Sequence, residues 1–188
     1  DLTGFGRTGK IFASDHLTLK PDLVALSKGL TGGTLPLGVT AVSEKILTAF
    51  RNNDFTKTFF HGHSFTGNPL ACAAANASFK LLLDDDCQKR IKEIAEQHRT
   101  FASKIREQKA VHEVRTLGTI IAIELKTPEK TSYSNSIREK IYSYFLERNI
   151  LLRPLGNTFY IVAPYCITSV QLTGVYQAIE TFLEMLTE

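Results

Sequence analysis

Residues 21–29 have the sequence Pro-Asp-Leu-Val-Ala-Leu-Ser-Lys-Gly, a short apolar run followed by a lysine. Four consecutive apolar residues, 23–26, are bounded by a proline and by a glycine, which predicts a short buried β-strand. Lys28 then lies where that strand ends. A lysine that loses solvation there can become neutral enough to form a Schiff base with an aldehyde cofactor, whereas the commoner alternative is a solvated loop lysine.

The rest of the chain alternates strand and helix patterns, which predicts an α/β fold. Strands are expected at 37–42, 111–117, 119–125, 150–153 and 158–163, and helices at 44–50, 70–83, 136–148 and 170–186. A long amphipathic helix is expected after Asp84-Asp85-Asp86, because apolar residues recur at helical spacing. They are Ile91, Ile94, Ala95, His98, Phe101, Ala102 and Ile105. The acidic triplet predicts a domain boundary, giving domains at 1–84 and 85–188.

Composition excludes several classes of protein. A chain of 188 residues with 43% hydrophobic and 22% charged residues is not intrinsically disordered. The net charge of +3 comes without a basic run, which argues against nucleic acid as a partner, and no apolar stretch of about 18 residues predicts a membrane span. Cys72, Cys87 and Cys166 are odd in number and widely spaced, as in a reduced cytoplasmic protein.

Two glycine- or histidine-containing motifs have alternative interpretations. Gly4-x-Gly6-x-x-Gly9 matches a dinucleotide-binding pattern but lacks the helix that should follow it, so a structural loop is expected. His61-Gly62-His63-Ser64-Phe65-Thr66-Gly67 precedes Asn68-Pro69, a helix start. This segment fits a phosphate or substrate loop, a turn that satisfies only itself, or half of a metal site that no nearby acid or cysteine completes.

Arg153 is a charged residue among apolar neighbours, in Leu151-Leu152-Arg153-Pro154-Leu155-Gly156-Asn157. A guanidinium in such a place suits two-point binding of a substrate carboxylate, and an internal salt bridge is the alternative.

Together these segments resemble the class III pyridoxal-phosphate aminotransferases. The resemblance is carried by residues 3–10, 21–38, 61–78 and 152–157. It implies fold type I: residues 1–84 as the C-terminal part of the large, cofactor-binding domain and 85–188 as a small α/β domain. Segments 61–78 and 152–157 are similar to members that convert 8-amino-7-oxononanoate to 7,8-diaminononanoate in biotin synthesis.

The resemblance also implies roles for single residues. Lys28 holds pyridoxal 5'-phosphate as a Schiff base, contacts the substrate and moves a proton between the substrate's α carbon and C4′ of the cofactor. Gly62 contacts the substrate and Arg153 binds its carboxylate. His63 and Ser64 meet the cofactor phosphate from the partner subunit of a homodimer, and no metal is implied.

Departures from the family pattern leave alternatives open. The residues His61-Gly62-His63-Ser64 stand where adenosylmethionine-using members often have His-Gly-Pro-Thr, so either adenosylmethionine or lysine is the expected amino donor. The family's acid partner of the pyridine nitrogen falls before Asp1, which could replace it only with a two-residue deletion, so the chain is expected to be a C-terminal portion. The alternatives are a class III aminotransferase for an omega-amine or ornithine-like substrate, and an inactive interaction or regulatory module.

Overall fold

The computed structural model describes residues 3–187, so any role of Asp1 lies outside the described residues. It divides into two compact units, one ending at Gln88 and the other beginning at Lys89. The division falls inside helix α3 (Asp85–Ile105). The domains 1–84 and 85–188 stay a proposal about the organisation of the chain.

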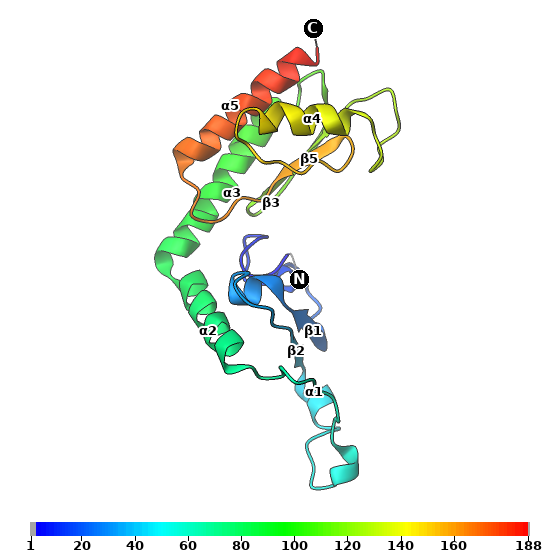
Figure 1. The fold of residues 1–188 in the computed structure, drawn as a ribbon, viewed down its shortest axis with the longest axis vertical. Helices are drawn as coiled ribbons and strands as arrows, with labels where there is room; N and C mark the ends of the chain where they lie inside the picture. Colours follow the sequence, from blue (N-terminus) through cyan, green and yellow to red (C-terminus); the bar gives the residue numbers. More distant parts are fainter. Residues whose placement is uncertain (1–2, 188) are drawn as a thin grey trace. The chain divides into compact units, whose positions relative to one another are not determined.

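The first unit contains a two-stranded antiparallel sheet and one long helix (Figure 1). Strands β1 and β2 pair with Leu23 opposite Val42 and Leu26 opposite Val39. The elements are η1 (Ala13–His16), β1 (Leu23–Leu26), η2 (Lys28–Thr31), β2 (Val39–Val42), α1 (Glu44–Leu47), η3 (Phe55–Lys57) and α2 (Pro69–Leu83).

The expectation that residues 23–26 form a buried strand is half right. The strand forms, but Leu23 is 58% exposed and Val24 and Leu26 are only half-buried. Within residues 3–187, β1 pairs with β2 alone, and two strands cannot enclose their own apolar side chains.

Helix α2 begins where the sequence predicts. The Asn68 side-chain oxygen accepts hydrogen bonds from the backbone N–H groups of Leu70, at 3.0 Å, and Ala71, at 3.2 Å. Pro69 occupies the first turn, where its missing N–H costs nothing.

The second unit packs three helices with an antiparallel sheet of order β3-β4-β5 around one apolar core. The predicted buried face of α3 is confirmed, since all seven residues named for it are buried. Helices α3 and α5 lie side by side (Figure 1), joined by a Lys104–Glu180 ion pair of 2.5 Å. The other elements are β3 (Val111–Leu117), β4 (Ile120–Leu125), α4 (Ile137–Leu146), β5 (Thr158–Ile161) and α5 (Ser169–Met185).

The strand predicted at 150–153 is wrong. Residues 150–154 form no helix or strand, and the chain next pairs at a bridge between Leu155 and Thr158. Pro154 lacks an N–H for a sheet ladder, which explains why apolar residues here do not form a strand.

His98 is the polar centre of the second unit. It is completely buried, with Nδ1 2.7 Å from the Tyr176 hydroxyl and Nε2 3.2 Å from the Thr119 carbonyl oxygen. A carbonyl oxygen can only accept, so Nε2 carries the hydrogen and Tyr176 donates to Nδ1. His98 therefore packs as a neutral ring, held in one tautomer.

No helix among residues 3–187 combines the length and the apolar character that crossing a bilayer requires.

Candidate active site

Lys28 lies two residues after the last residue of β1, at the strand end where the sequence predicts it, and opens the short helix η2. Its side chain is exposed, and its amine forms no hydrogen bond or ion pair within the described residues. Its backbone φ of +51° lies in the left-handed region, which costs a residue with a Cβ about 1–2 kcal/mol. Strain of this kind at a free amine marks a candidate functional position.

The backbone around Lys28 is supported from two directions. On one side, a Cβ added to Gly29 would lie 2.8 Å from Cδ2 of the buried Phe5 ring, so only glycine fits against this ring. On the other, the Ser78 hydroxyl of α2 donates to the Gly29 carbonyl oxygen at 3.4 Å. The turn closes on itself, since the Gly33 N–H donates to the Lys28 carbonyl oxygen at 3.3 Å.

The glycine-dense loop 3–10 supplies Phe5 to this support. Phe5 meets Phe12 edge to face, with ring centroids 5.7 Å apart. The residues after Gly9 form no helix until η1, which differs from the helix opening that dinucleotide binding requires. The loop has a structural role beside Lys28.

The segment 61–67 is a series of turns in the first unit. The His63 N–H donates to the Thr66 hydroxyl at 2.8 Å, and the Phe65 N–H donates to Nδ1 of His63 at 3.2 Å. Because Nδ1 accepts, the neutral ring carries its hydrogen on Nε2, which is free to donate to a ligand. The Ser64 hydroxyl and N–H also have no partner within residues 3–187.

The N-terminus of α2 is less available to an anion than its sequence suggests. Asn68 already binds the Leu70 and Ala71 amides, and its carbonyl oxygen accepts from the Cys72 amide at 3.0 Å. An anion at this segment would therefore be held by His63 and Ser64 rather than by the first amides of the helix.

Arg153 belongs to the second unit. It is exposed, while its neighbours Leu152 and Pro154 are buried. Its guanidinium forms no hydrogen bond or ion pair among the residues described, so the alternative of an internal salt bridge finds no acidic partner within residues 3–187. Its five donors are available to a carboxylate.

The predicted site residues fall into three groups. Gly62, His63 and Ser64 share one segment of the first unit, Lys28 lies in a separate turn of that unit, and Arg153 lies in the second unit. No hydrogen bond joins Lys28 to His63 or Ser64 within residues 3–187. Over the same range, His, Cys, Asp and Glu side chains form no group of three or more that could hold a metal ion.

Sequence reasoning missed the residues that support the site. Phe5 and Ser78 are distant from Lys28 along the chain, and no local pattern predicts that they converge on Gly29.

The turn after Arg153 has a local sequence signal, because Gly156-Asn157 between Leu155 and Thr158 is a two-residue hairpin sequence. The structure forms this hairpin, with Leu155 and Thr158 exchanging hydrogen bonds of 2.7 and 3.1 Å.

The sequence of this chain is similar to that of known aminotransferases. A family model described as aminotransferase class-III matches residues 2–183. The chain is 40% identical over 183 residues to the adenosylmethionine-8-amino-7-oxononanoate aminotransferase of Synechococcus elongatus, covering 97% of this chain and 42% of that protein. For the protein of the same name from Helicobacter pylori, identity is 36% over 191 residues, covering 99% and 42%.

Solved structures agree. The chain superposes on the adenosylmethionine-8-amino-7-oxononanoate aminotransferase of Methanocaldococcus jannaschii with a TM-score of 0.86 at 33% identity, covering 97% of this chain and 44% of that one. A PMP-bound aminotransferase from Vibrio fluvialis gives 0.86 at 25% identity, covering 98% and 42%. The predicted α/β aminotransferase fold is confirmed.

The chain spans about two fifths of the length of the relatives it matches, 42% of the protein from Synechococcus elongatus. The family model nevertheless covers almost all of the chain, including the turn that carries Lys28 and the loop that carries Arg153. This chain belongs to the class III aminotransferase family.

Proposed function

We propose that this chain carries the lysine, the phosphate-facing segment and the carboxylate-binding arginine of a pyridoxal-phosphate-dependent transferase. The reaction is amino transfer to 8-amino-7-oxononanoate, giving 7,8-diaminononanoate for biotin biosynthesis. One observation carries the proposal: Lys28 presents an amine that has no partner within residues 3–187, on a left-handed backbone that Phe5 and Ser78 support through Gly29.

The residues present fit the cofactor. In the described part of the chain, the Lys28 amine has no partner and could meet its aldehyde, and Nε2–H of His63 with the Ser64 N–H and hydroxyl are unpaired donors that could meet its phosphate. Pyridoxal phosphate, when bound, supplies an electron sink for the carbanion of the substrate. With the cofactor bound, Lys28 would act as the proton carrier, since its Nζ could accept the proton from the substrate's α carbon and return it at C4′.

Arg153 sets the orientation of the acceptor. The nonanoate carboxylate is remote from the amino and keto groups that react, so a guanidinium that holds it fixes the direction in which the substrate enters. Gly62 suits a substrate contact because it adds no side chain to the segment. Among residues 3–187, the atom near the position of its absent Cβ is Thr66 Oγ1, at 3.5 Å.

A homodimer is part of the proposal. Apolar side chains between residues 50 and 70 are exposed although they are large, which marks an interaction surface. They are Phe50, Phe55, Phe59, Phe60, Phe65 and Leu70. A second copy covering this surface would place His63 and Ser64, which lie within it, at the edge of the partner's site.

The three cysteines are unpaired, which suits the reducing cytoplasm that we propose for this protein.

The reaction is tested by incubating the chain with pyridoxal phosphate and 8-amino-7-oxononanoate, with adenosylmethionine or lysine as donor. Mass spectrometry then follows 7,8-diaminononanoate. Product is expected from the unaltered chain and from Lys20→Ala, which removes another exposed lysine, and not from Lys28→Ala.

Two results would contradict the proposal. Turnover only of simple keto acids with omega-amines or ornithine would mean a different class III substrate. Cofactor binding without turnover of any pair would mean an inactive interaction module.

A further inference from the structure

The loop that carries Arg153 is fixed on both sides. Before it, Leu152 is buried in the apolar core of the second unit. After it, Gly156 and Asn157 form the two-residue turn between Leu155 and Thr158. Gly156 has φ +63°, and a Cβ there would lie 1.6 Å from the Ser132 carbonyl oxygen. This end of the loop is therefore pressed against the segment 126–136, which connects β4 to α4.

Asn157 joins the loop to β4. Its carbonyl oxygen accepts from the Leu125 N–H at 2.9 Å, and its Nδ2 donates to the Leu125 carbonyl oxygen at 2.8 Å. Because that oxygen can only accept, the amide group must present nitrogen to it. The second hydrogen of Nδ2 points to the Thr131 hydroxyl, 3.2 Å away.

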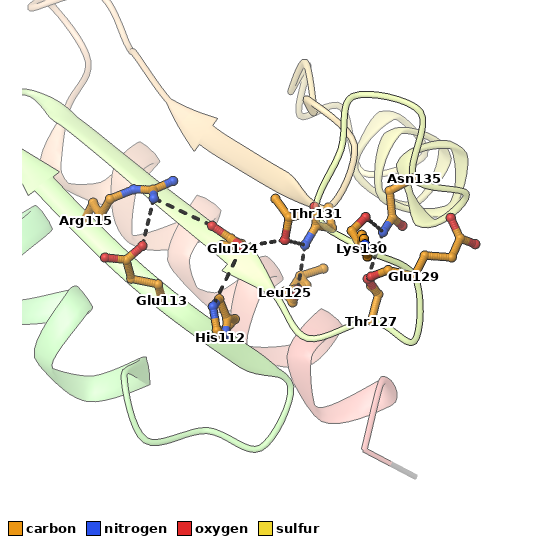
Figure 2. A network of polar contacts seen from close by, with 11 residues as sticks. His112, Glu113, Arg115, Glu124, Leu125, Thr127, Glu129, Lys130, Thr131 and Asn135 are labelled. Carbon is orange, nitrogen blue, oxygen red and sulfur yellow. Dashed lines mark hydrogen bonds and ion pairs between the residues drawn. The ribbon is translucent and has the colours of Figure 1, made fainter.

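Thr131 links Asn157 to the carboxylate of Glu124 through hydrogen bonds. Its hydroxyl donates to Oε1 of Glu124 at 2.7 Å, as Figure 2 shows, which leaves its oxygen free to accept from Asn157. Glu124 is 8% exposed and is also approached by Arg115, at 3.6 Å, and by His112, at 4.0 Å. Each donor in this series is polarised by the carboxylate at its end, which strengthens the bonds.

We infer that Asn157, Thr131 and Glu124 are positioning residues for Arg153, and that their hydrogen bonds hold the arginine's loop in the conformation that binds the substrate carboxylate. This inference rests on the carboxylate-binding role of Arg153 in the proposed function. Thr131 is the residue of the three that can be tested by substitution, because it is exposed and a change there does not disturb the apolar core.

Three variants separate the link from general stabilisation of the segment 126–136. Thr131→Val keeps the shape and removes both hydrogen bonds, whereas Thr131→Ser keeps the hydroxyl. Thr127→Val is the matched control: it removes the acceptor of a 2.8 Å hydrogen bond from Asn135 in the same segment (Figure 2). Among residues 3–187, Thr127 forms no hydrogen bond to Asn157.

The experiment titrates the full chain with nonanoate and follows the Nε–H resonance of Arg153 by NMR, assigned by its loss in Arg153→Lys. Thr131→Val is expected to weaken nonanoate binding about five- to tenfold, the effect of losing two hydrogen bonds, with Thr131→Ser and Thr127→Val within about twofold of the unaltered chain.

Equal affinities in the unaltered chain and Thr131→Val would overturn the inference and leave the proposed function standing. Equal weakening by Thr131→Val and Thr127→Val would overturn it too, because the segment would then act only through its overall stability. If the unaltered chain binds nonanoate no better than Arg153→Gln does, the carboxylate role of Arg153 is wrong, and the inference is wrong with it.

Discussion

Acid should destabilise the second unit through His98. Its ring is completely buried, with Nδ1 accepting from Tyr176 and Nε2 donating to Thr119. Burial lowers the pKa of His98 from 6.5 to about 4, against the smaller opposing effect of the Thr119 hydrogen bond. A proton added to Nδ1 would also take the place of the hydrogen bond that Tyr176 donates.

The sign and size of the effect follow from these two pKa values. The unfolded chain binds the proton below pH 6.5 and the folded chain only near pH 4, so acid favours the unfolded state between these limits. A pKa difference of about 2.5 corresponds to about 3 kcal/mol at 1.36 kcal/mol for each unit. The stabilisation is complete above pH 6.5 and is lost progressively down to pH 4.

Tyrosine fluorescence can report on this unit alone. The chain has no Trp, and its six tyrosines all lie beyond residue 130, in the second unit. Urea unfolding from pH 7.5 to 4 should show a loss of stability about 3 kcal/mol greater in the unaltered chain than in His98→Gln, whose amide can both accept and donate but does not titrate.

His112→Gln, the same change at a histidine whose side chain is 61% exposed, serves as the control and should retain the loss. Equal pH dependence of stability in the unaltered chain and in His98→Gln would mean that protonation of His98 does not cause the loss of stability in acid.

Four further substitutions test the local geometry of the two units. Gly156→Ala should destabilise the second unit by about 3 kcal/mol or more, because its Cβ would meet backbone at 1.6 Å. Gly174→Ala should stabilise it by up to about 1 kcal/mol, because Gly174 is an exposed position of α5 with open space where the Cβ would lie. Urea unfolding followed by tyrosine fluorescence checks both, and equal effects of the two substitutions would contradict the geometry. Asn68→Ala should cost about 1 kcal/mol of α2 stability, seen as faster hydrogen exchange of the Leu70 and Ala71 amides; unchanged exchange would exclude the cap. Gly29→Ala should cost the first unit about 1–3 kcal/mol, seen as faster exchange of the Gly32 amide, which donates to the Gly29 carbonyl oxygen; unchanged exchange would mean that Phe5 does not press on this turn.

Local patterns predicted the helices of this protein well. The buried face of α3 follows directly from apolar spacing, and the Asn68-Pro69 start of α2 from capping chemistry. Both signals lie within a few residues of the element that they define. The strand predicted at 150–153 does not form for a local reason as well, since Pro154 at the end of the apolar run has no N–H to donate to a sheet ladder.

What the sequence could not predict depends on contacts between distant residues. The position of Lys28 after a strand was found, but the Phe5 ring under Gly29 and the Ser78 hydroxyl from α2 reach it across long stretches of chain. The burial of β1 was overestimated because apolar composition alone does not say which element covers a strand. The hydrogen bond from Asn157 to Leu125 likewise spans 32 residues.

If Lys28 holds the cofactor, borohydride should trap pyridoxal phosphate on it, and peptide mapping of every lysine measures this. We expect labelling concentrated on Lys28 and abolished in Lys28→Arg, with exposed Lys20 and Lys45 labelled no more than other surface lysines. Labelling spread evenly over the surface lysines, and unchanged in Lys28→Arg, would contradict it.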